Sequence, residues 1–162
     1  SPNIDRLAAE GVLFSQAVST TSWTLPSHIS LLSGLLPEAH GVQRPRHTLP
    51  DWPVTLAEVM AAEGYQTAAV VSAPFLNSSY GMDQGFAMYD DESVAFSSNA
   101  DSHVGATAPQ VHEAAATWLR ASQGDRFFLF VHKWDVHYDY DPPPPSDSMF
   151  DPDYDGAINA NA

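Results

Sequence analysis

The sequence has 162 residues, of which 44% are apolar, and it contains no cysteine. This length and composition predict one globular domain with a sizeable core, without disulfides or thiolate metal ligands. The 20 acidic and 6 basic residues give a formal net charge of −14, which disfavours nucleic acid and anionic membranes as partners. No run approaches the roughly 18 apolar residues of a membrane span, so we expect no membrane segment here.

The hydrophobic pattern alternates between helical and strand-like segments along the chain. Helices are predicted over residues 3–10, over a stretch ending at Gly34, over residues 54–63 and over residues 107–121. Strands are predicted over residues 12–18, 65–72 and 126–134, the last two apolar enough for the middle of a sheet. Residues 37–53 and 73–105 are expected to be mostly loop. This alternation is typical of an α/β fold with a largely parallel sheet.

Both ends of this fold are expected to be incomplete. No predicted strand precedes the first helix, and the stretch YDGAINANA, which ends the sequence, resembles the beginning of a helix. A frayed tail is the alternative interpretation of that last stretch.

Three polar clusters follow candidate strands: residues 24–28, 72–77 and 132–137. Ligands gather at the carboxyl ends of parallel strands, so these clusters are expected to meet at one edge of the sheet. In the first cluster, Thr24 precedes a proline suited to a first helical turn, and His28 lies one turn further on. This arrangement suits a hydroxyl nucleophile acting on an anionic ester. The alternative is a helix capped by Thr21, Ser22 or Thr24, with His28 as a partly buried packing residue.

The third cluster holds His132, Asp135 and His137, which suit either proton transfer or a metal ion. Strand periodicity places His132 on the opposite side of the chain from Lys133, so one of the two histidines is expected to be structural. His40 is interpreted as a surface or turn-stabilising residue rather than a catalyst. The acidic run 90–92 is interpreted as a solvated loop.

Five motifs in this order resemble the sulfatase family of the alkaline phosphatase superfamily, across almost the whole chain. They are PNIDRLAAEGVLFSQAVS, TLPSHISLLSGLLPEAHGV, TLAEVMAAEGYQTAAV, GMDQGF and FFLFVHKWDVHYDYDPP. The resemblance implies an α/β/α sandwich and metal-dependent hydrolysis of sulfate or phosphate esters, small molecules or glycans. It also implies that residues 1–162 are part of one catalytic domain, with an upstream strand and a C-terminal part missing, so that this stretch alone is inactive.

The resemblance assigns roles to individual residues. Thr24 occupies the position of the cysteine or serine that becomes formylglycine, so Thr24 is implied to be the nucleophile and a metal-contacting hydroxyl. Its β-carbon already carries a methyl group, so formylglycine is not expected. His28 stands in place of the usual arginine and is a candidate to bind the anion. His137 is implied to bind the anion or to donate a proton to the leaving oxygen, and Lys133 is a candidate substrate-binding residue.

Two further features bear on these roles. Val71, Ser72, Ala73 and Pro74 stand where many sulfatases carry G-K-W-H, with its sulfate-binding lysine and histidine. The resemblance implies a divalent metal but does not distinguish calcium, magnesium, manganese and zinc. The other ligands of this metal are expected outside this sequence. A non-catalytic binding module and a phospho-group transferase with a threonine nucleophile are the alternative functions.

Overall fold

Three parallel strands form the sheet around which the chain is arranged in the computed structural model, which describes residues 2–92, 108–122 and 124–134. The strand order is β2 (Met88–Asp90), β1 (Gln66–Val70), β3 (Phe127–Val131), so β1 lies in the middle. Ala69 of β1 is level with Tyr89 of β2 and Phe130 of β3. The predicted central strand over residues 65–72 is confirmed, whereas β3 is an edge strand among the described residues.

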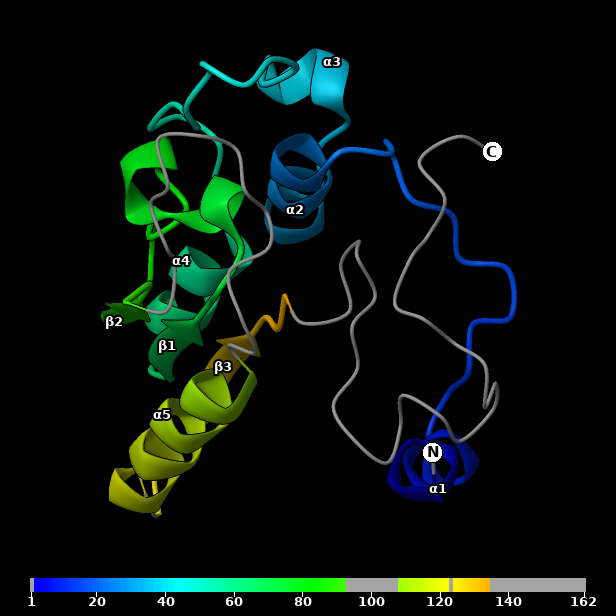
Figure 1. Ribbon diagram of the computed structural model, residues 1–162, viewed down its shortest axis with the longest axis vertical. Coiled ribbons are helices and arrows are strands. Elements are labelled where there is room, and N and C mark those ends of the chain that lie inside the picture. The colour runs from blue at the N-terminus through cyan, green and yellow to red at the C-terminus, as the bar shows by residue number, and fades with distance from the viewer. Residues whose placement is uncertain (1, 93–107, 123, 135–162) are drawn as a thin grey trace, which may run out of the picture.

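Helices cover both faces of this sheet (Figure 1). Ala69 and its neighbours on the adjoining strands pack in one core cluster with Leu25 and Ile29 of α2 (Thr24–Ser33). Val70, one residue on, points to the other face and packs with Val111 of α5 (Ala108–Ala121). Successive side chains of a strand point to opposite faces, and both faces of β1 are apolar. The predicted α/β class with a parallel sheet is therefore confirmed.

The remaining elements are short and connect these layers. They are α1 (Pro2–Glu10), α3 (Pro37–His40), α4 (Leu56–Ala62), and the 3₁₀ turns η1 (Pro74–Leu76) and η2 (Ser78–Tyr80). Among the described residues, no helix is long and apolar enough to span a membrane.

The strand predicted over residues 12–18 is wrong. These residues connect α1 to α2 without strand structure, and Val12, Phe14 and Val18 are 78–89% exposed. The connection and α1 lie apart from the sheet in Figure 1. A strand is stable when a neighbouring strand satisfies its backbone groups, and no strand of the described part of the chain lies beside this segment.

Both predicted loops contain regular structure. Residues 37–53 begin with α3, which Pro37 starts at a favoured helical position and Gly41 ends with a left-handed backbone, φ 78°. Residues 73–92 contain η1, η2 and β2, where the Ser, Asn and Gly content pointed to loop only. The segment 93–107 lies outside the described residues. Strand β2 was missed because three residues carry too little periodicity to identify a strand.

Helix α4 begins two residues later than predicted because Thr55 caps it. The Thr55 hydroxyl accepts the Glu58 N–H at 3.2 Å, and a Glu58 carboxylate oxygen accepts the Thr55 N–H at 2.8 Å. The Thr55 hydroxyl donates in turn to the Gln84 carbonyl at 3.0 Å. This reciprocal cap satisfies two backbone N–H groups and fixes the neighbouring turn at residues 84–85 against α4.

A buried histidine joins α3 to α2. His40 is 2% exposed, and its Nδ1 accepts the Val42 N–H at 3.1 Å. Its Nε2 therefore carries the proton and donates to the Ser30 hydroxyl at 3.2 Å. Of the two interpretations of His40, the turn-stabilising one is confirmed, and a surface position is wrong because the residue is buried. Burial lowers the pKa of His40, and a hydrogen bond to the Pro26 carbonyl and the charge of Glu38 act in the opposite direction.

We expect Gly85→Ala to lower the free energy of unfolding by roughly 3 kcal/mol or more. Gly85 has φ 86°, and an added Cβ would lie 2.5 Å from the Glu58 backbone nitrogen and 2.9 Å from the Thr55 hydroxyl oxygen. Gly34→Ala is the matched control, because Gly34 has φ 70° but no atom within 4 Å of its added Cβ. Chemical denaturation measures both, and equal losses would contradict the predicted clash.

We expect thermal stability to fall as the pH drops below about 6.5, and His40→Gln to remove part of that slope. A histidine whose pKa is lowered by folding binds fewer protons in the native state than when unfolded. The unfolded state therefore gains stability as the pH falls through the unfolded pKa. Melting temperatures of the two proteins between pH 5 and pH 8 measure this effect, and parallel curves would exclude His40 as a contributor.

Candidate functional site

Helix α2 begins without a side-chain cap. Its N-cap residue is Trp23, with an extended backbone (φ −122°, ψ 141°) and no side-chain hydrogen bond to the first turn. The alternative in which Thr21, Ser22 or Thr24 caps the helix is therefore wrong, and Thr24 is instead the first helical residue. The first N–H groups of a helix have no partner within the helix and favour an anion nearby. The half-buried Thr24 thus lies at a helix end suited to negative charge.

The backbone carbonyl of Thr24 fixes the ring of His28. Nδ1 of His28 lies 2.8 Å from this carbonyl oxygen, which can only accept, so Nδ1 carries a proton. The Ser27 hydroxyl donates to the same carbonyl at 2.9 Å. Burial lowers the pKa of His28, and the hydrogen bond to Thr24 opposes that shift less strongly. The neutral imidazole is thereby favoured, and in this tautomer its Nε2 has a free lone pair.

His28 meets the end of strand β3. Its ring centroid lies 5.2 Å from that of His132 and 6.2 Å from that of Phe130, both in edge-to-face arrangements. The first and third predicted polar clusters therefore do converge at the carboxyl end of the sheet.

The second cluster joins them through Ser72. The Ser72 hydroxyl donates to the His132 carbonyl at 3.3 Å and accepts the Trp134 N–H at 2.9 Å. Ser72 therefore holds the chain just beyond β3, where His132 contacts His28. These two hydrogen bonds explain why a polar residue that is only 2% exposed is tolerated just after an apolar strand.

A pocket of about 300 Å³ lies beside α2. His28 and the hydroxyl residues Ser27 and Ser30 line it from the helix, and Ser19 and Thr20 line it from the preceding connection. Hydroxyl groups and one imidazole can hydrogen-bond a polar ligand.

The other predicted site residues are placed less closely. Lys133 is exposed, while His132 is partly buried, as the predicted alternation along the strand requires. No hydrogen bond within the described part of the chain joins Lys133 to Thr24 or His28. Asp135 and His137 lie outside the described residues.

The acidic run is not a solvated loop. One carboxylate oxygen of Asp91 accepts three hydrogen bonds, from the Asn77 side chain at 2.6 Å and from the backbone N–H and hydroxyl of Ser78 at 2.8 Å each. Asp91 therefore fixes the turn at η2, a role that the sequence pattern did not indicate. Asp90 belongs to β2.

The described residues do not hold a complete metal site. Within residues 2–92, 108–122 and 124–134, no three His, Asp or Glu side chains lie close enough together to bind one ion. A single threonine hydroxyl does not retain a divalent cation, because such ions take six or more oxygen ligands or about four nitrogen and oxygen ligands.

A family model for sulfatases matches residues 1–160, nearly the whole chain. The chain belongs to the sulfatase family. The position of Thr24, at the head of the T-L-P-S-H segment, in the family's nucleophile motif stays a prediction. Members of this family generally use a divalent metal.

Two curated relatives match a stretch of the chain. Arylsulfatase A of Bos taurus is 45% identical over 73 residues, which cover 41% of this chain and 14% of that protein. An ulvan-active sulfatase of Formosa agariphila is 41% identical over 68 residues, covering 42% of this chain and 13% of that protein. The chain thus spans about a seventh of the length of these relatives.

Two solved structures share the fold. A protein in complex with its substrate D-glucosamine-2-N,6-O-disulfate matches with a TM-score of 0.72 at 20% identity, over 94% of this chain and 33% of that one. A phosphonate monoester hydrolase of Agrobacterium radiobacter matches with a TM-score of 0.67 at 20% identity, over 89% of this chain and 38% of that one. At this identity the likeness establishes the fold.

We expect His28 at pH 7.5 to be neutral and protonated on Nδ1, with Nε2 unprotonated. The hydrogen bond to the Thr24 carbonyl requires that tautomer. Imidazole ¹⁵N chemical shifts measure it directly, with His28→Gln used to assign the signals. A signal from Nε2–H with unprotonated Nδ1 would contradict the geometry described here.

Proposed function

We propose that this chain carries the nucleophile of a sulfatase-family hydrolase that cleaves sulfate or phosphate esters through the hydroxyl of Thr24. The observation that carries the proposal is the position of Thr24. It is the first residue of an uncapped helix and lies one turn from His28, in a chain of the sulfatase family. This helix end favours an anionic substrate, and the Thr24 side chain is half-buried rather than sealed in the core.

The proposal gives His28 the role of proton acceptor. An arginine at this position would supply a permanent positive charge, whereas burial keeps a histidine here neutral near pH 7. The Thr24 carbonyl holds Nδ1, which leaves the lone pair of Nε2 for a proton. A hydroxyl needs such a partner because its own pKa is far above neutral. His137 and Lys133 are proposed to bind the anion.

The proposed reaction has two displacements. In the first, the Thr24 oxygen loses its proton to His28 and forms a bond to sulfur or phosphorus. The bond from that atom to the leaving oxygen breaks, and His137 supplies the proton that the leaving oxygen takes. In the second, water gives a proton to His137 and attacks the same atom, and the bond to the Thr24 oxygen breaks. His28 returns its proton to that oxygen, which regenerates the hydroxyl as inorganic sulfate or phosphate departs.

The family's divalent metal is a further part of the proposal. The described residues do not provide a complete set of ligands for it. When bound, a divalent ion would lower the cost of negative charge on the attacking oxygen and on the transferred group.

The substrate is proposed to be a sulfated carbohydrate. The relatives include an ulvan-active sulfatase, and one structural neighbour holds a disulfated glucosamine. The net charge of −14 is compatible with a small anionic ester and disfavours a nucleic-acid substrate.

We expect Thr24→Ala to lower kcat in the full-length protein by at least about a thousandfold, because this substitution removes the attacking oxygen. Aryl sulfate and aryl phosphate are both assayed, and kcat is compared on the better substrate. Thr24→Ser keeps that oxygen and is expected to retain measurable turnover. Ser22→Ala, an exposed neighbour outside the helix, is the control and is expected to leave kcat unchanged.

Each result of this experiment bears on one part of the proposal. Undiminished turnover in Thr24→Ala would show that Thr24 is not the nucleophile. Turnover that persists in the presence of a chelator would show that the reaction needs no metal. Absence of turnover of both esters in the unaltered protein would favour a non-catalytic binding module. The mass of the peptide containing Thr24 is expected to match unmodified threonine.

A further inference from the structure

We propose that the surface loop of residues 42–53 is a second anion-binding site, which holds a sulfate or carboxylate group of a carbohydrate away from the reacting ester. The proposal rests on the proposed function for the identity of the ligand, but the site is argued from the loop itself. Arg44 and Arg46 are both exposed in this loop. They are two of only six basic residues in a chain with 20 acidic ones.

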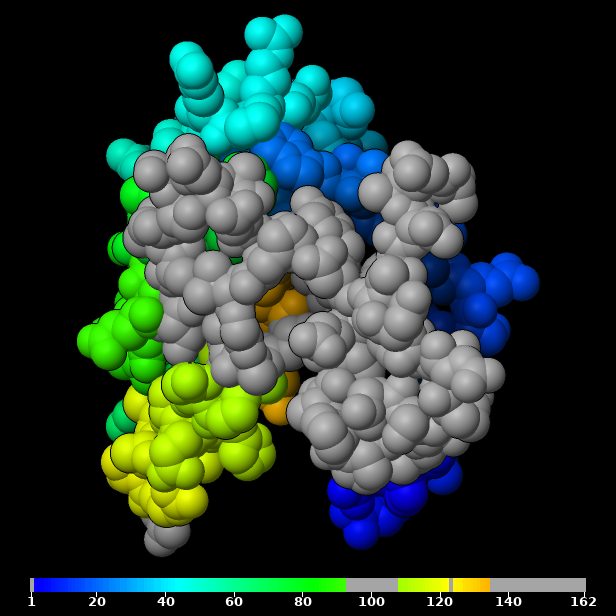
Figure 2. Space-filling model, viewed as in Figure 1, coloured from blue at the N-terminus to red at the C-terminus, as the bar shows by residue number. Residues whose placement is uncertain are grey.

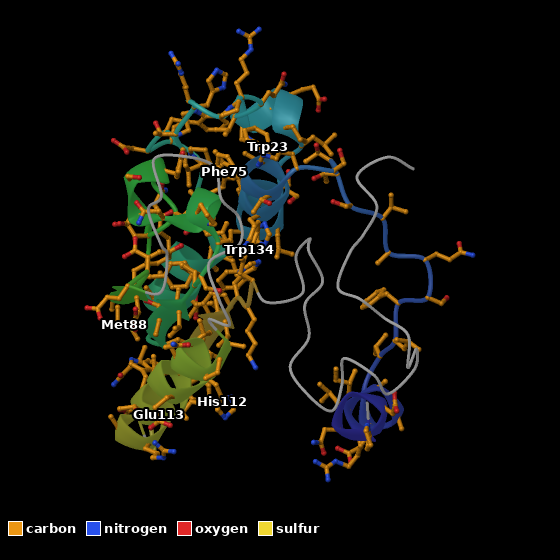
Figure 3. The ribbon with its side chains drawn as sticks, in the orientation of Figure 1. Trp23, Phe75, Met88, His112, Glu113 and Trp134 are labelled. Atoms are coloured by element: carbon orange, nitrogen blue, oxygen red, sulfur yellow. The ribbon has the colours of Figure 1, made fainter. Side chains whose placement is uncertain are left out.

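The loop is anchored at two points in the core cluster to which α2 also contributes. Val42 and Leu49 are buried in the same core cluster as Leu25, the residue that follows Thr24. Leu49 also donates its N–H to the Tyr80 carbonyl at 2.9 Å. Rings then connect Tyr80 to Phe75, with centroids 5.8 Å apart, and Phe75 to Trp23, 5.3 Å apart (Figure 3). Trp23 is the residue from which α2 begins.

Between these anchors the backbone forms a fixed turn. The His47 N–H donates to the Arg44 carbonyl at 3.0 Å, and Pro45 lies between the two arginines. Nδ1 of His47 lies 3.0 Å from the Gly41 carbonyl oxygen and 3.3 Å from the Gln43 backbone nitrogen, so its ring fills the turn in either tautomer. Proline and these bonds restrict the backbone before any ligand arrives, which lowers the entropy lost on binding.

The turn presents its charges to solvent. Figure 2 shows the cyan segment that contains it projecting from the top of the molecule. Among the described residues, no acidic side chain forms an ion pair with Arg44 or Arg46. An ion pair in this part of the chain joins Arg120 to Glu113, both on α5. Guanidinium groups bind sulfate and carboxylate oxygens through paired N–H donors. Two such groups on one rigid turn suit a multiply charged anion.

An exposed tryptophan in the same loop favours a carbohydrate over another polyanion as the ligand. Trp52 is 60% exposed, and an exposed indole offers a flat apolar surface on which the apolar face of a sugar ring can pack. Extended nucleic acid would meet the remaining acidic surface, whereas a short sulfated sugar would contact only the loop and the neighbouring helix end.

The test measures binding to a sulfated oligosaccharide in the Thr24→Ala background of the full-length protein, so that turnover does not intervene. We expect the paired substitution Arg44→Ala with Arg46→Ala to weaken binding about tenfold or more at low salt, and Trp52→Ala to weaken it about threefold or more. Arg120→Ala, which removes an exposed arginine from α5, is the matched control and is expected to leave binding unchanged.

Several outcomes would overturn the proposal. Equal affinity in the paired arginine variant, or an equal loss in Arg120→Ala, would show that the loop is not a specific site. Tighter binding of a single-stranded oligonucleotide with the same number of charges would exclude carbohydrate as the preferred ligand. Melting temperatures verify that the variants fold. Because binding is measured without turnover, it remains informative if Thr24 is not the nucleophile.

Discussion

The parallel pairing of β1 with β3 is the interaction on which the candidate site depends. It joins segments about 60 residues apart in sequence, and it continues past the strands through the His132 N–H, which donates to the Val70 carbonyl at 2.9 Å. Ser72 extends the same connection to Trp134. Without this register, His132 would not lie against His28, and the α2 end would have no facing residue. Because one residue of slip would turn every side chain of β3 to the other face, the apolar residues on both faces fix the position of His132 as well as the core.

The sequence predicted the part of the fold that strong periodicity determines. The β1 strand, the α2 helix ending at Gly34 and α5 are long enough to carry a clear pattern, and their predictions are confirmed. The prediction over residues 12–18 was wrong because alternating apolar residues favour a strand only where a neighbour pairs with it. Short elements such as α3 and β2 are set by contacts between distant residues, which no local pattern contains.

Part of the candidate site could likewise be predicted from the sequence, and part could not. The sequence placed Ser72 and His132 just after two parallel strands, so their meeting was predictable. The contact of His28 with His132 did not follow from that reasoning, because the strand expected before residues 24–28 does not form. The tautomer of His28 and the role of Asp91 were not predictable, because each depends on one hydrogen-bond geometry between groups of ordinary composition. Family resemblance supplied the chemical role proposed for Thr24, which the local pattern alone left open between a cap and a nucleophile.

The neutral His28 and the basic loop both determine where this chain can attract an anion. A sulfatase-family protein handles anions, yet this chain has a net charge of −14 and a neutral imidazole where the family usually has arginine. Long-range attraction of an anionic substrate is therefore weak, and screening confines any useful positive charge to within about 8–10 Å of where it is needed. The uncapped start of α2 provides partial positive charge at the proposed reacting group, while Arg44 and Arg46 provide full charges on a loop whose Val42 and Leu49 share a core cluster with α2. A substrate with two anionic groups gains from both, whereas a singly charged ester gains only from the first, so this distribution of charge favours multiply sulfated carbohydrates.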